Sequence, residues 1–174
     1  MVIAAKTGQG KTLCFGIPIL DICVRKLEKT DSKTLDSLKG LILSPTRELA
    51  IQIKDMLEAV IPVEYEKDIR ICALVGGMSI QKQLRLLKYK PAIIIATPGR
   101  LWELLSDHSI PYLRNGLPMI DVLVLDEADR MIADGHFKEM KDILAHIYTT
   151  RVAMKNSHKN NAEKPSIKHL KEID

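Results

Sequence analysis

The chain has 174 residues, of which 46% are hydrophobic, 28% are charged and only 4% are aromatic, and its formal net charge is +4. This length fits one domain with its own core and is too short for two, and the composition excludes a disordered or fibrous protein. The apolar runs fall far short of the ~18 residues of a membrane-spanning helix, so we expect no membrane partner. Three cysteines without metal-ligand spacing indicate an intracellular, reduced protein.

Short apolar runs alternate along the chain with segments in which apolar residues recur every three or four positions. The runs are rich in Ile, Val and Leu with little alternation, which is typical of parallel strands buried on both faces. They occupy residues 2–4, 40–43, 69–75, 91–96 and 120–125. Helical spacing covers residues 13–27, 49–60 and 137–147. This alternation predicts an α/β doubly wound parallel sheet, whose ligands bind beyond the carboxyl ends of the strands.

Most of the net positive charge lies at the C-terminal end of the chain. Residues 149–174 are basic and polar and have no sustained apolar period. We therefore expect the folded domain to span residues 1–148, and residues 149–174 to form a basic polar tail that is a loop or a frayed helix and is largely disordered. Because the rest of the chain is nearly neutral, overall charge does not indicate nucleic-acid binding, and any such function has to rest on particular loops.

Residues 5–12 read AKTGQGKT and lie between the first apolar run and a helical segment. This is the pattern of a phosphate-binding loop, although Ala5 stands where the first Gly is usual. Glycines let backbone N–H groups surround a phosphate, Lys11 brings a mobile positive charge to it, and Thr12 offers a hydroxyl to Mg²⁺. The alternative is a glycine-rich turn that binds nothing. The predicted nucleotide-binding residues are Ala5, Thr7, Gly8, Gln9, Gly10, Lys11 and Thr12.

Residues 126–129 read DEAD and directly follow the apolar run 120–125. Carboxylates at the end of a buried strand are costly unless they act on a cation or a water. Beside a phosphate loop, Asp126 is placed to hold the Mg²⁺ of a nucleotide, and Glu127 to orient and deprotonate the attacking water. The alternative is the acidic start of a helix. The two motifs together favour hydrolysis of a nucleoside triphosphate, with Lys11 and Glu127 as catalytic residues.

Three further motifs lie between the loop and the DEAD tetrad: PTRELA at 45–50, GG at 76–77 and TPGR at 97–100. In this order and at this spacing, the five motifs resemble the N-terminal lobe of DEAD-box ATP-dependent RNA helicases. The resemblance implies a P-loop, RecA-like parallel sheet flanked by helices, with ATP and Mg²⁺ as ligands. The sequence DEADRM followed by Gly135, His136 and Phe137 is similar to the ribosome-biogenesis branch, which implies a nuclear or nucleolar protein.

The resemblance also implies an RNA-binding surface. In this family the three central motifs hold the sugar–phosphate backbone, so the contacts are independent of base sequence and sensitive to salt. Guanidinium groups, threonine hydroxyls, close-approaching glycines and free N–H groups at helix starts all suit phosphate oxygens. The implied residues are Pro45, Thr46, Arg47, Gly76, Gly77, Thr97, Pro98, Gly99 and Arg100.

The chain departs from the family pattern at both ends. The family's upstream adenine-reading Gln motif is absent, and no Ser-Ala-Thr motif or second RecA-like lobe with arginine fingers follows DEAD. We therefore expect a sheet that is incomplete at both ends, and a fragment that neither separates strands nor turns over ATP appreciably. A non-catalytic nucleotide- or RNA-binding fragment is the alternative. Another P-loop enzyme, such as a small-molecule kinase, leaves the three central motifs without a role.

Overall fold

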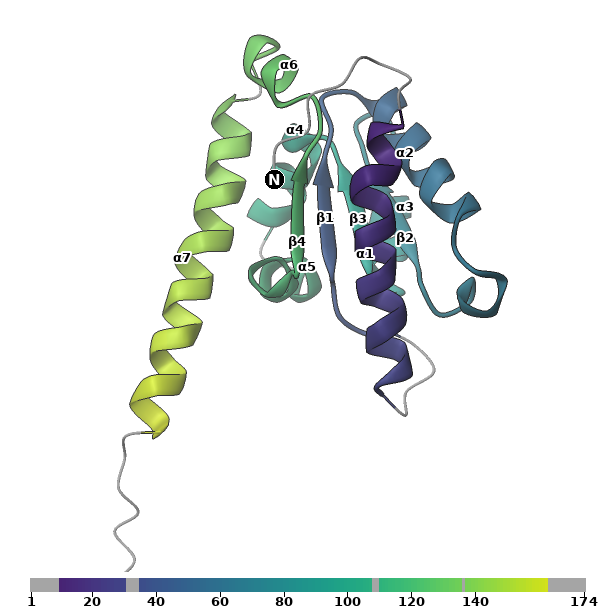
Figure 1. Ribbon diagram of the computed structural model, residues 1–174. Helices are drawn as coiled ribbons and strands as arrows, with labels where there is room; N and C mark the ends of the chain where they lie inside the picture. Colours follow the sequence, from purple (N-terminus) through teal and green to yellow (C-terminus); the bar gives the residue numbers. More distant parts are fainter. Residues whose placement is uncertain (1–9, 31–34, 108–109, 136, 163–174) are drawn as a thin grey trace, which may run out of the picture.

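The computed structural model describes residues 10–30, 35–107, 110–135 and 137–162 (Figure 1). Its centre is a parallel sheet in the order β2-β3-β1-β4. The strands are β1 (Gly40–Leu43), β2 (Ile71–Leu74), β3 (Ile93–Ala96) and β4 (Val122–Leu125). Each of them lies within an apolar run of the sequence, which confirms the predicted parallel α/β architecture. The strand expected at residues 2–4 lies outside the described residues.

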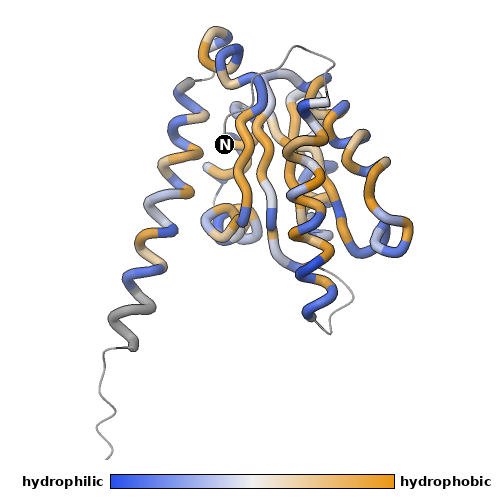
Figure 2. The backbone as a smooth tube through the Cα atoms, viewed as in Figure 1, coloured by the Kyte–Doolittle hydropathy of each residue, from blue (hydrophilic) through white to orange (hydrophobic). Residues whose placement is uncertain are grey.

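Helices connect the strands and cover both faces of the sheet (Figure 1). Figure 2 shows that the strands are coloured mostly as hydrophobic, while the helices have mixed sides. The helical elements are α1 (Lys11–Glu28), α2 (Arg47–Ala59), η1 (Val63–Tyr65), α3 (Ile80–Lys88), α4 (Pro98–Ser106), α5 (Pro111–Gly116), η2 (Leu117–Met119), α6 (Ala128–Ala133) and α7 (Phe137–Ala162).

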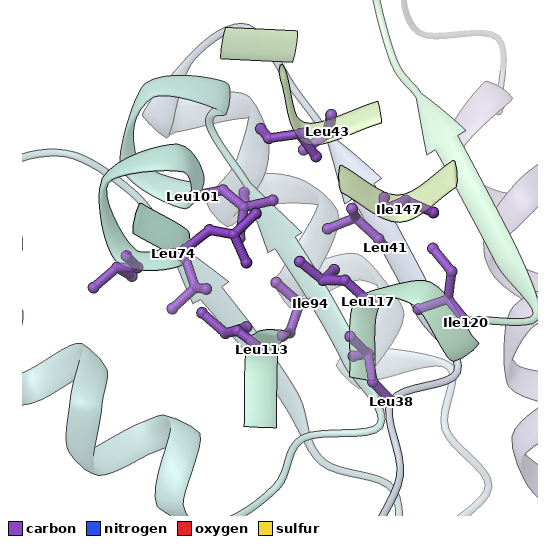
Figure 3. Close-up of a cluster of buried hydrophobic side chains, with 14 of the residues drawn as sticks. Leu38, Leu41, Leu43, Leu74, Ile94, Leu101, Leu113, Leu117, Ile120 and Ile147 are labelled. Atoms are coloured by element: carbon purple, nitrogen blue, oxygen red, sulfur yellow. The ribbon is translucent and has the colours of Figure 1, made fainter. Parts of the chain in front are cut away.

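Successive strand residues belong to two separate hydrophobic clusters. Leu41 and Leu43 pack into a cluster with residues of α4, α5, η2 and α7 (Figure 3), whereas Ile42 packs with residues of α1 and α2. Each fully buried aliphatic side chain contributes roughly 1.5–3 kcal/mol. Because both faces of the sheet are covered, neither needs polar residues, and the strands are continuous apolar runs.

Strand β4 is less protected than the other strands. Leu123 and Leu125 are each 37% exposed, whereas every residue of β1 and β3 is buried. Within the described part of the chain, β4 pairs only with β1. The expected incompleteness of the sheet stays a prediction on this side, because residues 2–4 are not described.

Helix α7 extends through Ala162, so residues 149–162 continue a helix that begins at Phe137. This stretch is therefore helical, one of the two forms expected for the tail, and the expected end of the folded domain at residue 148 stays a prediction. Ile143 and Ile147 are buried, and the Arg151 guanidinium donates to the Ile120 carbonyl at 2.7 Å. These contacts hold the middle of the helix on the domain, while its last part projects beyond it (Figure 1). Residues 163–174 lie outside the described residues. Among the helices described, none combines the length and apolarity needed to cross a membrane.

Candidate functional site

The described motifs lie at the carboxyl ends of the four parallel strands. PTRELA follows β1, GG follows β2, TPGR follows β3 and DEAD follows β4, and all four strands run in the same direction. Their side chains therefore meet at one edge of the sheet, where α/β proteins bind ligands. The first residues of α1 come to the same edge.

Helix α1 begins directly after Gly10, whose φ of +75° is a left-handed conformation that glycine adopts without strain. No side chain caps this helix start within the described residues. The first N–H groups of α1 therefore have no capping partner there. They create a partial positive potential next to Gly10, which favours an anion. Lys11 and Thr12 lie in the first turn and are partly exposed. Ala5, Thr7, Gly8 and Gln9 of the predicted nucleotide-binding set lie outside the described residues.

Asp126 continues the end of β4, since its N–H donates to the Leu43 carbonyl at 2.9 Å. Burial raises the pKa of Asp126, the neighbouring Glu127 carboxylate raises this pKa further, and the positive charge of Lys11 lowers it. Lys11 at the start of α1 and Asp126 at the end of β4 lie at the same edge of the sheet, which accounts for this effect of the Lys11 charge. A partly desolvated carboxylate beside a lysine is an environment that a bound cation would complete.

Glu127 adopts a left-handed conformation, with φ 48° and ψ 49°, at the start of α6. For a residue with a side chain this costs about 1–2 kcal/mol, and strain of this kind clusters at functional sites. Arg130 lies one turn along α6, and its guanidinium is 3.4 Å from the Glu127 carboxylate and 3.3 Å from Asp134. Two features therefore fix the position of the Glu127 carboxylate: the strained backbone of Glu127 and the salt bridge with Arg130.

The turn after β1 leads directly into α2. Thr46 is the N-cap, and its hydroxyl accepts a hydrogen bond from the Leu49 N–H at 3.3 Å. Arg47 occupies the first helical position and is exposed, whereas Pro45 is buried and shapes the turn without offering a surface. Ser44 was not among the predicted site residues; it is fully buried, and its hydroxyl has no hydrogen-bond partner in the described structure.

The GG loop after β2 lies against Arg47. Gly77 has a φ of +74°, and a Cβ atom at this position would lie 2.4 Å from the Arg47 Nη1 atom. A glycine is favoured here by the backbone conformation, and a Cβ atom would also require the exposed end of the Arg47 side chain to shift. The amide of Gln83 is fully buried and donates to the carbonyls of Val75 at 3.1 Å and Met78 at 2.9 Å, which holds the loop from behind. Sequence reasoning did not single out Gln83.

The TPGR turn after β3 begins α4 with a proline at its first position, where the missing N–H costs nothing. Thr97 makes no side-chain cap, Pro98 is buried, and a Cβ atom at Gly99 would meet open space. The side chain of Arg100 is only 13% exposed and lies 3.2 Å from Glu103. Its Nε and Nη1 atoms are buried without an aligned hydrogen-bond acceptor. Donor capacity is therefore left at this turn.

The residues present fit a magnesium ion that is bound mainly through a nucleotide. In the described part of the chain, no three His, Cys, Asp or Glu residues gather to form a metal site. Mg²⁺ in nucleotide enzymes typically takes only one or two carboxylates and completes its shell with phosphates and waters. Asp126 and the Thr12 hydroxyl supply oxygen donors of the kind that this ion prefers.

The fold and the placement of these motifs define a RecA-like helicase domain. A family model described as DEAD/DEAH box helicase matches residues 1–161. The chain belongs to this family.

Individual curated relatives show which members of the family the chain is similar to. The chain is 47% identical over 150 residues to the ATP-dependent RNA helicase MAK5 of Eremothecium gossypii, a match that covers 84% of this chain and 19% of the relative. It is 45% identical over 161 residues to DEAD-box ATP-dependent RNA helicase 13 of Oryza sativa subsp. japonica, covering 84% of this chain and 18% of that protein. The chain thus spans about a fifth of the length of these relatives.

Solved structures show the same fold. The yeast DEAD-box splicing factor Prp28 has a TM-score of 0.69 at 33% identity, over 84% of this chain and 32% of that one. Mss116p bound to ssRNA and AMP-PNP has a TM-score of 0.67 at 33% identity, over 82% of this chain and 27% of that one.

Proposed function

We propose that this chain is the first, ATP- and RNA-contacting lobe of an ATP-dependent RNA helicase. The observation that carries the proposal is that the start of α1, with Lys11, and the end of β4, with Asp126, lie at the sheet edge where the three central motifs also lie. Family membership supports it, as do relatives that are named ATP-dependent RNA helicases. The similar structure of Mss116p is bound to ssRNA and AMP-PNP, which supports these two classes of ligand for the present chain.

The nucleotide would lie beyond the N-terminus of α1. There Lys11 would neutralise charge on its phosphates, and Asp126 and Thr12 would hold Mg²⁺, which would neutralise further phosphate charge. Glu127 orients the attacking water and accepts its proton, and the salt bridge from Arg130 positions this carboxylate. Catalysis of this type consists of positioning and electrostatic stabilisation, so it depends on a complete site.

RNA would lie across the turns that follow β1, β2 and β3. Arg47 is exposed there, Arg100 has guanidinium N–H groups without aligned acceptors, and Thr97 has a hydroxyl that caps nothing. These groups suit phosphate oxygens and read no bases, so we expect binding without sequence preference. Pro45 and Pro98 act by shaping the turns. A role in ribosome biogenesis, and hence a nucleolar location, is the finer proposal that the DEADRM–GHF resemblance implies.

Two binding measurements test this proposal on the chain itself. Fluorescent mant-ATP should bind in a Mg²⁺-dependent manner, and Lys11→Ala should weaken binding by about tenfold or more, the equivalent of one lost charge-assisted contact. Lys26→Ala, at an exposed position of the same helix, is the matched control and should bind normally. Equal loss in both variants would show that Lys11 is not a phosphate ligand.

RNA binding is measured with two fluorescein-labelled oligonucleotides of unrelated sequence. Their affinities should agree and should fall together as salt increases. Arg47→Ala should lower the slope of log K against log salt by about one, because one phosphate contact is lost. Arg85→Ala on α3 removes a similar exposed charge away from the site and should leave the slope unchanged. A strong preference for one sequence would contradict the proposed backbone contacts.

The alternatives make different predictions. A non-catalytic binding fragment would give the same results in both binding assays. It would differ from a helicase lobe only in failing to turn over ATP when a second lobe is supplied. A small-molecule kinase does not account for Arg47, Gly77 and Arg100, and the family match disfavours it. An unlabelled RNA should displace the labelled oligonucleotide from the chain, whereas small molecules with an acceptor hydroxyl should not displace it.

A further inference from the structure

The hydrogen-bond ladder of the sheet continues one residue past the carboxyl ends of three strands. The N–H groups of Thr97, Ser44 and Asp126 donate to carbonyls of the neighbouring strand at 3.1, 3.0 and 2.9 Å respectively. Because β1 lies between β3 and β4 (Figure 1), Ser44 lies between the other two residues. Residues at the same register of parallel strands point to the same face, so the three polar side chains form one row at the edge of the candidate site.

This row belongs to the face of the sheet that α1 and α2 cover. Side chains alternate along a strand, so Ser44 points to the same side as Ile42, and Asp126 to the same side as Val124. Ile42 belongs to the hydrophobic cluster built with α1 and α2, and Val124 packs against it. Pro45 restricts Ser44 to extended backbone, which preserves the alternation. The hydroxyl of Ser44 therefore lies beside the Asp126 carboxylate on the face where α1 begins.

Ser44 is fully buried, and its hydroxyl has no hydrogen-bond partner in the described structure. A buried polar atom without a partner costs stability, and alanine would fill the same place without this cost. Gln83, the other fully buried polar residue in the described part of the chain, uses its amide to donate to two carbonyls of the GG loop. The Ser44 hydroxyl has no such structural contact, so it is available to a partner that forms with a ligand.

We propose that Ser44 is a positioning residue for Asp126: when Asp126 holds the Mg²⁺ of a bound nucleotide, the Ser44 hydroxyl donates to the carboxylate oxygen that does not contact the ion. Paired positions on neighbouring strands have Cβ atoms about 5 Å apart, so a change of one serine rotamer brings the two groups within hydrogen-bond distance. Partners of this kind orient metal ligands. The inference rests on the proposed function and adds a residue outside the five motifs to its metal site.

The Mg²⁺ dependence of mant-ATP binding tests this role on the 174-residue chain. Ser44→Ala should raise the Mg²⁺ concentration at half-maximal binding about tenfold, because the ligand loses its orienting hydrogen bond. Binding in EDTA should change less than about twofold. The melting temperature without nucleotide should equal or exceed that of the parent chain, since an unpartnered buried hydroxyl is removed. An unchanged Mg²⁺ dependence in Ser44→Ala would overturn the inference.

Ser79→Ala is the control for loss of a serine hydroxyl. Ser79 is the N-cap of α3, and its hydroxyl accepts from the Lys82 N–H at 3.3 Å. This variant should melt at a lower temperature, because it loses a helix cap, and should keep the Mg²⁺ dependence of the parent chain. The same rise in the required Mg²⁺ concentration in both serine variants would show that the effect is not specific to Ser44, and the inference would fail.

A double-mutant cycle determines whether Ser44 acts through Asp126. Adding Ser44→Ala to Asp126→Asn should change mant-ATP binding less than about twofold, because the group that Ser44 positions is already altered. A further loss of about tenfold would place the hydroxyl's effect elsewhere and overturn the inference. A parent chain that binds no mant-ATP would overturn the proposed function and this inference with it. Normal binding by the parent and an identical Ser44→Ala variant would overturn this inference alone.

Discussion

The Arg47 guanidinium occupies the space that a side chain on Gly77 would fill. A Cβ atom at residue 77 would lie 2.4 Å from Arg47 Nη1, and the φ of Gly77 is +74°. Two motifs that are 30 residues apart in the sequence thus form one surface: the GG loop supports the arginine of PTRELA. The absence of a side chain at Gly77 thus leaves room for the Arg47 guanidinium in the conformation observed.

Gly77→Ala should destabilise the chain by about 1–2 kcal/mol, because the left-handed backbone conformation is strained for a residue with a Cβ atom. It should also weaken oligonucleotide binding, since the Arg47 side chain has to move. Gly76→Ala is the control for stability: its Cβ atom would meet open space and its φ is not positive. Urea denaturation of both variants tests the difference, and equal stabilities would contradict the role assigned to Gly77.

Gln83→Met should cost about 1–3 kcal/mol, because it leaves the buried carbonyls of Val75 and Met78 without their donor. Methionine keeps a similar length, so loss of packing is not the main effect. Hydrogen exchange in the loop at 75–78 should accelerate along with the loss in stability. Gln81→Met, at an exposed position two residues earlier on α3, should be nearly neutral.

The raised pKa of Asp126 predicts the direction in which the stability of the chain changes with pH. Its folded-state pKa lies above the ordinary value of 3.8, so the folded chain holds this proton more tightly than the unfolded chain does. The resulting stability is fully present below the ordinary pKa and is lost as the pH rises through the raised one. Asp126→Asn should therefore melt at a higher temperature than the parent chain at neutral pH.

Near pH 4 and below, the difference in melting temperature between Asp126→Asn and the parent should shrink toward zero. The same variant should lose Mg²⁺-dependent nucleotide binding, which separates the structural cost of the charge from its proposed function. Asp134→Asn, on the exposed end of α6, provides the comparison. A parent chain that is more stable than Asp126→Asn at neutral pH would show that the sign is wrong.

Arg151→Ala should loosen the second half of α7. The charged hydrogen bond to the Ile120 carbonyl is worth roughly 1.5–3 kcal/mol where it is shielded, and less here because the arginine is exposed. Amide hydrogen exchange over residues 149–156 should become faster, while the buried turn around Ile143 stays protected. Lys155→Ala removes an exposed charge from the same helix and should not change the pattern. Rapid exchange of residues 149–156 in the parent chain would restore the disordered tail that the sequence suggested.

Local features of this protein could be predicted from the sequence. The strands were found because buried parallel strands are uninterrupted apolar runs, and β1 was placed at its observed bounds, residues 40–43. The motifs were readable because the chemistry of a phosphate or metal site is carried by a few adjacent residues with particular side chains. Thr46 as a helix cap and Pro98 at a helix start follow from the same local rules.

Relations between distant segments were decided only by the tertiary structure. The packing of Arg47 on Gly77, the support of the GG loop by Gln83 and the burial of Pro45 leave no periodic signal, because each depends on which strands become neighbours. The attachment of the extended α7 depends partly on a contact of the same kind, because Arg151 donates to the carbonyl of Ile120, 31 residues away. Composition and spacing record what a segment can form by itself. They do not record the contacts that form only after the sheet order β2-β3-β1-β4 has brought the strand ends together.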